Sequence, residues 1–166
     1  LPPAPCAERL SEESGRPAAA LAAAGIRELF EETGLALGRP GDWPDPPPGW
    51  EAFAARGLVP DARALRFVFR AVTPEGRPRR FDARFLLADA AAITGDPDDF
   101  AAATDELTHL QWVPLDRARR FDLPFITEIV LAEVAARLPA LDAPSHVPFF
   151  RNDDEELAVA RLGLGR

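Results

Sequence analysis

The segment from Pro17 to Gly34 constrains the fold of this chain most, because it has a strong helical pattern with a defined start and end. The fixed φ of Pro17 suits a first helical position, with Ser14 or Gly15 near the cap, and the Ala-rich sequence that follows favours helix. Gly34 suits the position just past a helix, where the backbone turns left-handed. We therefore predict a helix that runs to Thr33.

Three carboxylates share one face near the end of this predicted helix. On a wheel turning about 100° per residue, Glu28, Glu31 and Glu32 fall together and Arg27 lies beside Glu31. The opposite face is apolar and suits a core: Ala22, Ile26, Leu29 and Phe30. One side of the helix is thus expected to pack while the other presents negative charge.

Carboxylates at positions i and i+4 repel each other, which destabilises a helix. Negative charge near the C-terminal end of the helix dipole destabilises it further. A hard cation resolves this conflict, because carboxylate oxygens suit Mg²⁺ or Mn²⁺. Glu28 and Glu32 lie about 6 Å apart along the axis, close enough to share one ion or hold a neighbouring pair, and Arg27 can fix the rotamer of Glu31. For any single glutamate, a solvated acidic face paired with Arg27 is the alternative interpretation.

The string Arg27-Glu28-Leu29-Phe30-Glu31-Glu32-Thr33-Gly34-Leu35 resembles the second half of the Nudix box, R-E-U-x-E-E-x-G-U with U aliphatic. This resemblance implies an α/β/α sandwich with a mixed sheet, and Mg²⁺-dependent hydrolysis of nucleoside diphosphates linked to another moiety. It implies that Glu28 and Glu32 are metal ligands. Glu31 would be a further ligand or a catalytic base paired with Arg27.

The first half of the box is not matched, because Ala19 stands where the family pattern has a glutamate. A branch resembling coenzyme A diphosphatases carries a long insertion inside the box, and residues 1–24 look like such an insertion, with 1–16 as an irregular arm. We expect a single domain over residues 1–166, with the Gly-Gly loop and first strands lying before Leu1. Coenzyme A or an acyl derivative is the first expected substrate. The alternatives are an ADP-ribose or nucleotide-sugar diphosphatase and a non-catalytic nucleotide-binding module.

Alternating apolar and polar residues predict strands over residues 64–72 and 80–87, and a third strand is predicted over 107–113. Residues 50–56 suggest a short helix, and apolar residues at helical spacing predict a longer one from Pro124 to about Leu138. The prolines of residues 38–48 predict a loop. This order of elements indicates a mixed α/β or α+β fold.

Two further places carry candidate site residues. Arg80, Asp82 and Arg84 share one face of their predicted strand, where the arginines can hold substrate phosphates while Asp82 fixes a guanidinium. A salt-bridged outer strand face explains the same pattern. Glu106 precedes the third predicted strand, in a region where the resemblance implies a metal-binding or catalytic carboxylate. A solvated loop glutamate is the alternative.

Composition limits the partners. The net charge is −8 and no basic run is long enough to follow a nucleic-acid backbone, which argues against a nucleic-acid polymer as partner. A small phosphorylated substrate is compatible with this charge, because a divalent cation can offset it locally. The single cysteine, Cys6, excludes an internal disulfide and a cysteine-based zinc cluster. No apolar run approaches the roughly 20 residues of a membrane span, so we expect no membrane partner. The single cysteine fits a reducing cytoplasm, which is the expected location. All 19 basic residues are arginine, which fits a GC-rich bacterial genome. A homodimer is a possible assembly.

Overall fold

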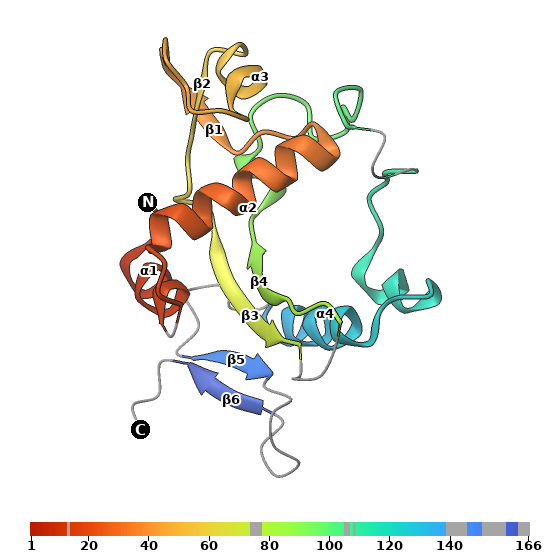
Figure 1. Cartoon of the computed structure of the whole chain (residues 1–166). Helices are drawn as coiled ribbons and strands as arrows, with labels where there is room; N and C mark the ends of the chain where they lie inside the picture. Colours follow the sequence, from red (N-terminus) through yellow and green to blue (C-terminus); the bar gives the residue numbers. More distant parts are fainter. Residues whose placement is uncertain are drawn as a thin grey trace. The chain divides into compact units, whose positions relative to one another are not determined.

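The computed structural model describes residues 1–12, 14–73, 78–104, 107, 109–138, 146–150 and 159–162. The chain forms two compact units (Figure 1). The first unit holds residues 1–65 and 88–112, and the second holds 66–87 and 113–166. The expectation of a single domain over 1–166 stays a prediction.

Two helices that pack against each other begin the first unit, α1 (Ala4–Ser11) and α2 (Ala18–Thr33). The boundaries of α2 confirm the predicted helix: it starts after Pro17 and buries Ala22 and Ile26. The expectation of an irregular arm over residues 1–16 is wrong, because 4–11 are helical. Cys6 and Leu10 stand one turn apart and are both buried, so the segment gains enough apolar contact to hold a short helix.

The remaining elements of the first unit are short. Strands β1 (Gly38–Pro40) and β2 (Leu58–Pro60) form an antiparallel pair, and α3 (Glu51–Ala54) and the 3₁₀ helix η1 (Ala90–Ala92) complete the unit. The short helix α3 was predicted. The loop predicted for 38–48 is wrong over its first three residues, because a two-stranded sheet tolerates a proline at the end of an edge strand.

The second unit is built on a mixed sheet with the strand order β4-β3-β5-β6 (Figure 1). Its strands are β3 (Arg66–Val72), β4 (Asp82–Leu87), β5 (Val147–Phe150) and β6 (Val159–Leu162). Strand β5 runs parallel to β3, and the other pairs are antiparallel. The 3₁₀ helix η2 (Leu115–Arg120) and helix α4 (Phe125–Arg137) complete the unit. Helices and a mixed sheet confirm an α+β fold.

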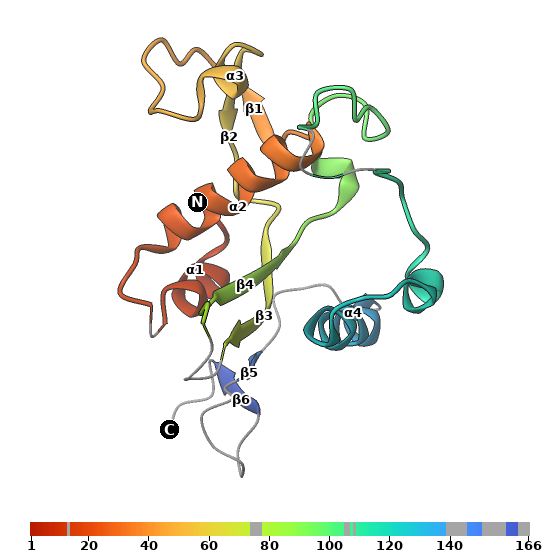
Figure 2. The same cartoon turned by 45° about the vertical axis from the view of Figure 1, so that its right-hand side comes forward.

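Helix α4 and strand β3 pack together in the core of the second unit (Figure 2). Val68 and Phe69 of the strand contact Val130 and Val134 of the helix. The register between β3 and β4 shifts between Phe67 and Phe69, which is a bulge. The bulge interrupts the side-chain alternation at Val68, and Phe67, Val68 and Phe69 are all buried, whereas the sequence predicted buried residues at every second position.

The strand predicted over 107–113 is wrong for its described residues, 107 and 109–113, which have no strand pairing. His109 has a φ of 61°, in the left-handed region, and this conformation does not fit an extended strand. Trp112 is 53% exposed, and its indole N–H donates to the carbonyl of Pro97 at 3.1 Å. The tryptophan therefore ties two loop segments together.

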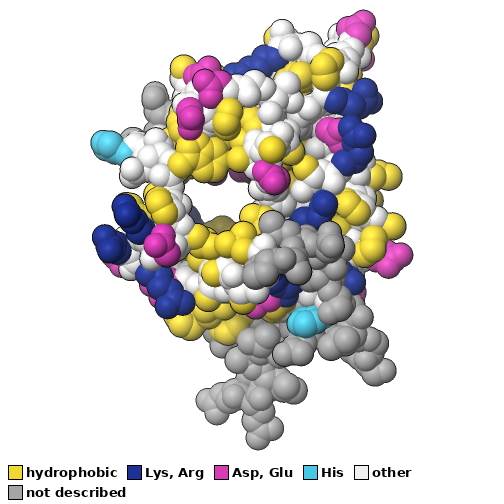
Figure 3. Space-filling model, turned by 180° about the vertical axis from the view of Figure 1, so that it is seen from behind, with side chains coloured by type: hydrophobic (Ala, Val, Ile, Leu, Met, Phe, Trp, Pro, Cys, Tyr) yellow, Lys and Arg dark blue, Asp and Glu magenta, His cyan; other side chains and the backbone are white. Residues whose placement is uncertain are grey.

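Within the described part of the chain, no helix has the length and apolar character needed to cross a bilayer. On the face shown in Figure 3, acidic and basic side chains lie in small groups among hydrophobic ones.

Candidate functional site

The C-terminal end of α2 carries the candidate metal-binding residues, and Gly34 ends the helix directly after Thr33. Gly34 has a φ of 77° and donates its amide hydrogen to the carbonyl of Phe30 at 2.9 Å. A Cβ at Gly34 would lie 3.0 Å from the backbone carbon of Ala102. Both the left-handed backbone and this close approach require glycine, so the helix stops at a fixed point after Glu32.

Arg27 lies between two of the predicted site glutamates. Its Nη2 is 3.5 Å from Oε1 of Glu28, and its Nε is 3.6 Å from Oε1 of Glu31. The helical wheel predicted that Arg27 lies beside Glu31, and the structure places it there. The side chains of Glu28 and Glu31 are 57% and 44% exposed, so these contacts are weak and leave both carboxylates accessible.

The turn at Gly49 lies against this arginine and glutamate. A Cβ at Gly49 would lie 3.7 Å from Cδ of Arg27 and 3.9 Å from Oε1 of Glu31. The Gly49 amide donates to Oε2 of Glu51 at 2.8 Å, which holds the turn at the start of α3. The Pro-rich loop that precedes α3 therefore borders the α2 carboxylates.

The acidic loop before Glu106 also contacts the end of α2. The amide of Thr104 donates to the main-chain carbonyl of Glu31 at 3.1 Å, and Thr94 bridges to Ala36 just beyond the helix. Carbonyls in the last turn of a helix need such partners, and this loop supplies one. Glu106 itself lies outside the described residues, so its predicted role stays a prediction.

The fit of a divalent cation depends on carboxylates from α2. Oxygen donors of this kind suit Mg²⁺ or Mn²⁺. Among the residues that the structure describes, no group of three or more His, Cys, Asp or Glu side chains is placed to hold a metal ion. Glu28 and Glu31 contact Arg27 instead, and because both are partly exposed, their rotamers have room to change. The donor chemistry fits a hard cation, and convergence of Glu28, Glu31 and Glu32 on one ion stays a prediction.

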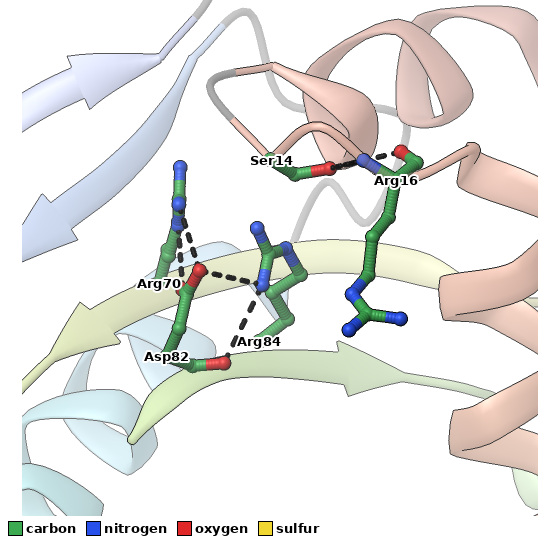
Figure 4. A network of polar contacts seen from close by, with 5 residues as sticks. All are labelled: Ser14, Arg16, Arg70, Asp82 and Arg84. Atoms are coloured by element: carbon green, nitrogen blue, oxygen red, sulfur yellow. Dashed lines mark hydrogen bonds and ion pairs between the residues drawn. The ribbon is translucent and has the colours of Figure 1, made fainter. Parts of the chain in front are cut away.

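In the second unit, Asp82 joins two arginines across strands β3 and β4 (Figure 4). Nε and Nη2 of Arg70 donate to the two carboxylate oxygens of Asp82 at 2.8 and 2.9 Å, and Nη1 of Arg84 lies 3.0 Å from Oδ2. Arg70 and Arg84 are directly opposite in the ladder, a placement that is unfavourable for like charges. Asp82 offsets this repulsion from a diagonal position.

The pKa of Asp82 reflects opposing effects. Burial raises the pKa of this carboxyl, but the hydrogen bonds and charge of Arg70, with a smaller contribution from Arg84, outweigh burial and hold the pKa below its ordinary value. The guanidinium of Arg70 also stacks over the ring of Phe149, with Cζ 4.3 Å from the ring centroid. The result is a fixed ionic cluster on a largely buried strand.

The two predicted phosphate-binding arginines, Arg80 and Arg84, do not lie on the same strand face. Asp82 and Arg84 share one strand face, as predicted, and Asp82 does fix a guanidinium. Arg80, however, precedes β4 and is exposed, so the prediction that it belongs to the strand is wrong. Residues 74–77 before it lie outside the described part of the chain. Sequence reasoning missed Arg70, whose signal is an arginine within the apolar run of β3, across the hairpin from Asp82-Ala83-Arg84.

Comparisons with protein-family models, with curated proteins and with solved structures found no match to this chain. The functional assignment therefore depends on the residues themselves, above all those of α2.

Proposed function

We propose that this chain is a Nudix-type hydrolase with an α/β/α sandwich fold, and that it cleaves a diphosphate bond in a nucleoside diphosphate derivative with Mg²⁺ or Mn²⁺. One observation carries the proposal. Helix α2 brings Glu28, Glu31 and Glu32 into its last two turns, with Arg27 beside Glu31 and Gly34 ending the helix. The sequence of this segment resembles the second half of the Nudix box, and a helix that ends at a glycine supports the proposal.

Each residue has a proposed role in hydrolysis. Glu28 and Glu32 hold the cation, which when bound polarises a phosphoryl oxygen and lowers the pKa of a water molecule. Glu31 acts as a further ligand or accepts the proton of the attacking water, and Glu106 is the other candidate base. Arg27, with Nε 3.6 Å from Oε1 of Glu31, is the proposed partner that orients the Glu31 carboxylate. That Arg80 and Arg84 contact phosphate charge stays a prediction.

The proposed substrate is coenzyme A or an acyl-coenzyme A, from the resemblance alone. A panel of coenzyme A, ADP-ribose, a nucleotide sugar and a nucleoside triphosphate tests it, with Mg²⁺, with Mn²⁺ and with a chelator, and with products identified by mass. We expect cleavage at a diphosphate in the presence of metal and none with the chelator. Intact substrates throughout the panel would contradict the enzymatic proposal.

A nucleotide-binding module is the second candidate function. Its distinguishing sequence feature would be a broken set of glutamates, whereas Glu28, Glu31 and Glu32 are all present. A module of this kind binds nucleotide without Mg²⁺ and releases no product, so calorimetry with and without metal, run on the same panel, distinguishes the two functions.

A further inference from the structure

Aromatic side chains form a continuous row in the first unit, from its core to its surface. The ring centroids of Phe30 and Phe53 are 5.0 Å apart, those of Phe53 and Trp50 are 5.3 Å apart, and those of Trp50 and Trp43 are 5.6 Å apart. Phe53 and Trp50 are buried, whereas Trp43 is partly exposed. We call these four residues the aromatic row, and Trp43 is its solvent end.

The row is held at its middle and at its core end. Phe53 belongs to α3, and the Trp50 amide donates to the carbonyl of Pro47 at 3.1 Å. At the core end, the guanidinium of Arg56 lies 4.7 Å from the ring centroid of Phe30 and donates to the carbonyl of Gly34 at 3.0 Å. Prolines at 44 and 46–48 restrict the loop that carries Trp43. A ring fixed in this way loses little conformational entropy when a ligand stacks on it.

The row also lies beside the candidate site. Trp50 directly follows Gly49, where a Cβ would lie 3.7 Å from Cδ of Arg27 and 3.9 Å from Oε1 of Glu31. Trp43 packs on Trp50 with their ring planes inclined by 48°. Trp43 is therefore linked, through Trp50 and the turn at Gly49, to the segment that contacts Arg27 and Glu31.

We propose that Trp43, supported by Trp50, is the stacking surface for the base of a nucleoside diphosphate whose phosphates lie against α2. The inference rests on the proposed function, which places the phosphates of the substrate against α2. It adds a binding surface for the base of the substrate. A nucleobase has a flat π face that stacks on a tryptophan ring, and this contact accepts any base. The alternative role of Trp43 is only to anchor its loop.

The test measures binding of two matched ligands that cannot be hydrolysed. One is α,β-methylene-ADP, which carries a base, and the other is methylenediphosphonate, which does not. Calorimetry with Mg²⁺ compares wild type with Trp43→Leu and Trp43→Phe. Trp112→Leu is the control, because Trp112 is an exposed tryptophan that packs at 6.3 Å from Phe100 on a different loop.

We expect Trp43→Leu to weaken α,β-methylene-ADP binding roughly 5- to 100-fold and to leave methylenediphosphonate binding unchanged. Trp43→Phe should retain most of the nucleotide affinity, which shows that a flat ring is what matters even if the leucine variant folds poorly. Equal weakening of both ligands, or unchanged nucleotide binding in a folded Trp43→Leu protein, would overturn the inference, as would a wild type that binds no nucleotide. A wild type that binds nucleotide through Trp43 but hydrolyses no diphosphate would support the base site and refute the proposed hydrolase.

Discussion

The carboxylate of Asp82 accepts two hydrogen bonds from the guanidinium of Arg70, at 2.8 and 2.9 Å. Arg70 is 4% exposed, and its side chain lies on a central strand of the sheet. A buried charge is unfavourable without compensating contacts, and the Asp82 carboxylate supplies two hydrogen bonds and an opposite charge to Arg70. The second unit therefore depends on an ionic contact between two adjacent strands as well as on its apolar core.

Replacing Asp82 with asparagine should destabilise the protein. The amide keeps the shape of the side chain but removes the negative charge that faces Arg70 and Arg84. The side chain of Asp82 is 41% exposed, so water offsets part of the loss. We expect the free energy of unfolding to fall by about 2 kcal/mol. Urea unfolding measures this, with Asp122→Asn as a control at an exposed aspartate. Equal stability of the two variants would show that the contact contributes nothing.

The same contact predicts a pH dependence. The pKa of Asp82 is lower in the folded protein than its ordinary value of about 3.9, so its stabilisation is present above that value and is lost as the pH falls further. The stability difference between wild type and Asp82→Asn should be constant between about pH 5 and pH 7 and shrink below about pH 4. Unfolding midpoints across this range measure it. A difference that grows on acidification would contradict the assigned direction.

Gly34→Ala should destabilise the first unit more than Gly57→Ala. Both glycines have positive φ, 77° and 68°, which costs an alanine about 1–2 kcal/mol. A Cβ at Gly34 would also press on the backbone of Ala102, whereas a Cβ at Gly57 meets no atom within 4 Å. Denaturant unfolding of both variants separates the effect of the close contact from the effect of the positive φ. Equal losses of unfolding free energy in the two variants would mean that the loop around Ala102 moves away without cost.

Arg27→Gln should lower the turnover of a diphosphate substrate roughly 10- to 100-fold, because Glu31 loses the neighbouring guanidinium that is proposed to orient its carboxylate. We expect kcat to fall with KM little changed, as for a residue that orients a reacting group. Arg63→Gln is the matched control, since it also removes an arginine from an ion pair of the first unit. A rise in KM at constant kcat would instead assign Arg27 to substrate binding.

Local sequence signals were enough to predict the elements that carry the candidate site. Pro17 and Gly34 bound α2, and Pro124 precedes α4, because both residue types act through their own backbone geometry. Helical spacing also predicted that Arg27 lies beside Glu31, because residues four apart on a helix are neighbours whatever surrounds them.

Features that depend on tertiary contacts could not be predicted in this way. Helix α1 forms because Cys6 and Leu10 find a surface to pack against, and β1 exists because β2 pairs with it. The bulge near Val68 buries consecutive residues, which no alternation pattern indicates. Arg70 was missed because its partner lies 12 residues away, across a hairpin.

The central claim is that the carboxylates of α2 support metal-dependent hydrolysis, and Glu32→Gln tests it most directly. The measurement is Mg²⁺-dependent turnover of the best diphosphate substrate, with melting temperature as the check of folding and Glu8→Gln as the control at an exposed glutamate of α1. We predict that the turnover of Glu32→Gln falls by at least roughly 10- to 100-fold, which is the loss typical for a residue that supports a metal ligand. Glu8→Gln should keep full activity. A folded Glu32→Gln protein with the turnover of wild type would contradict the account.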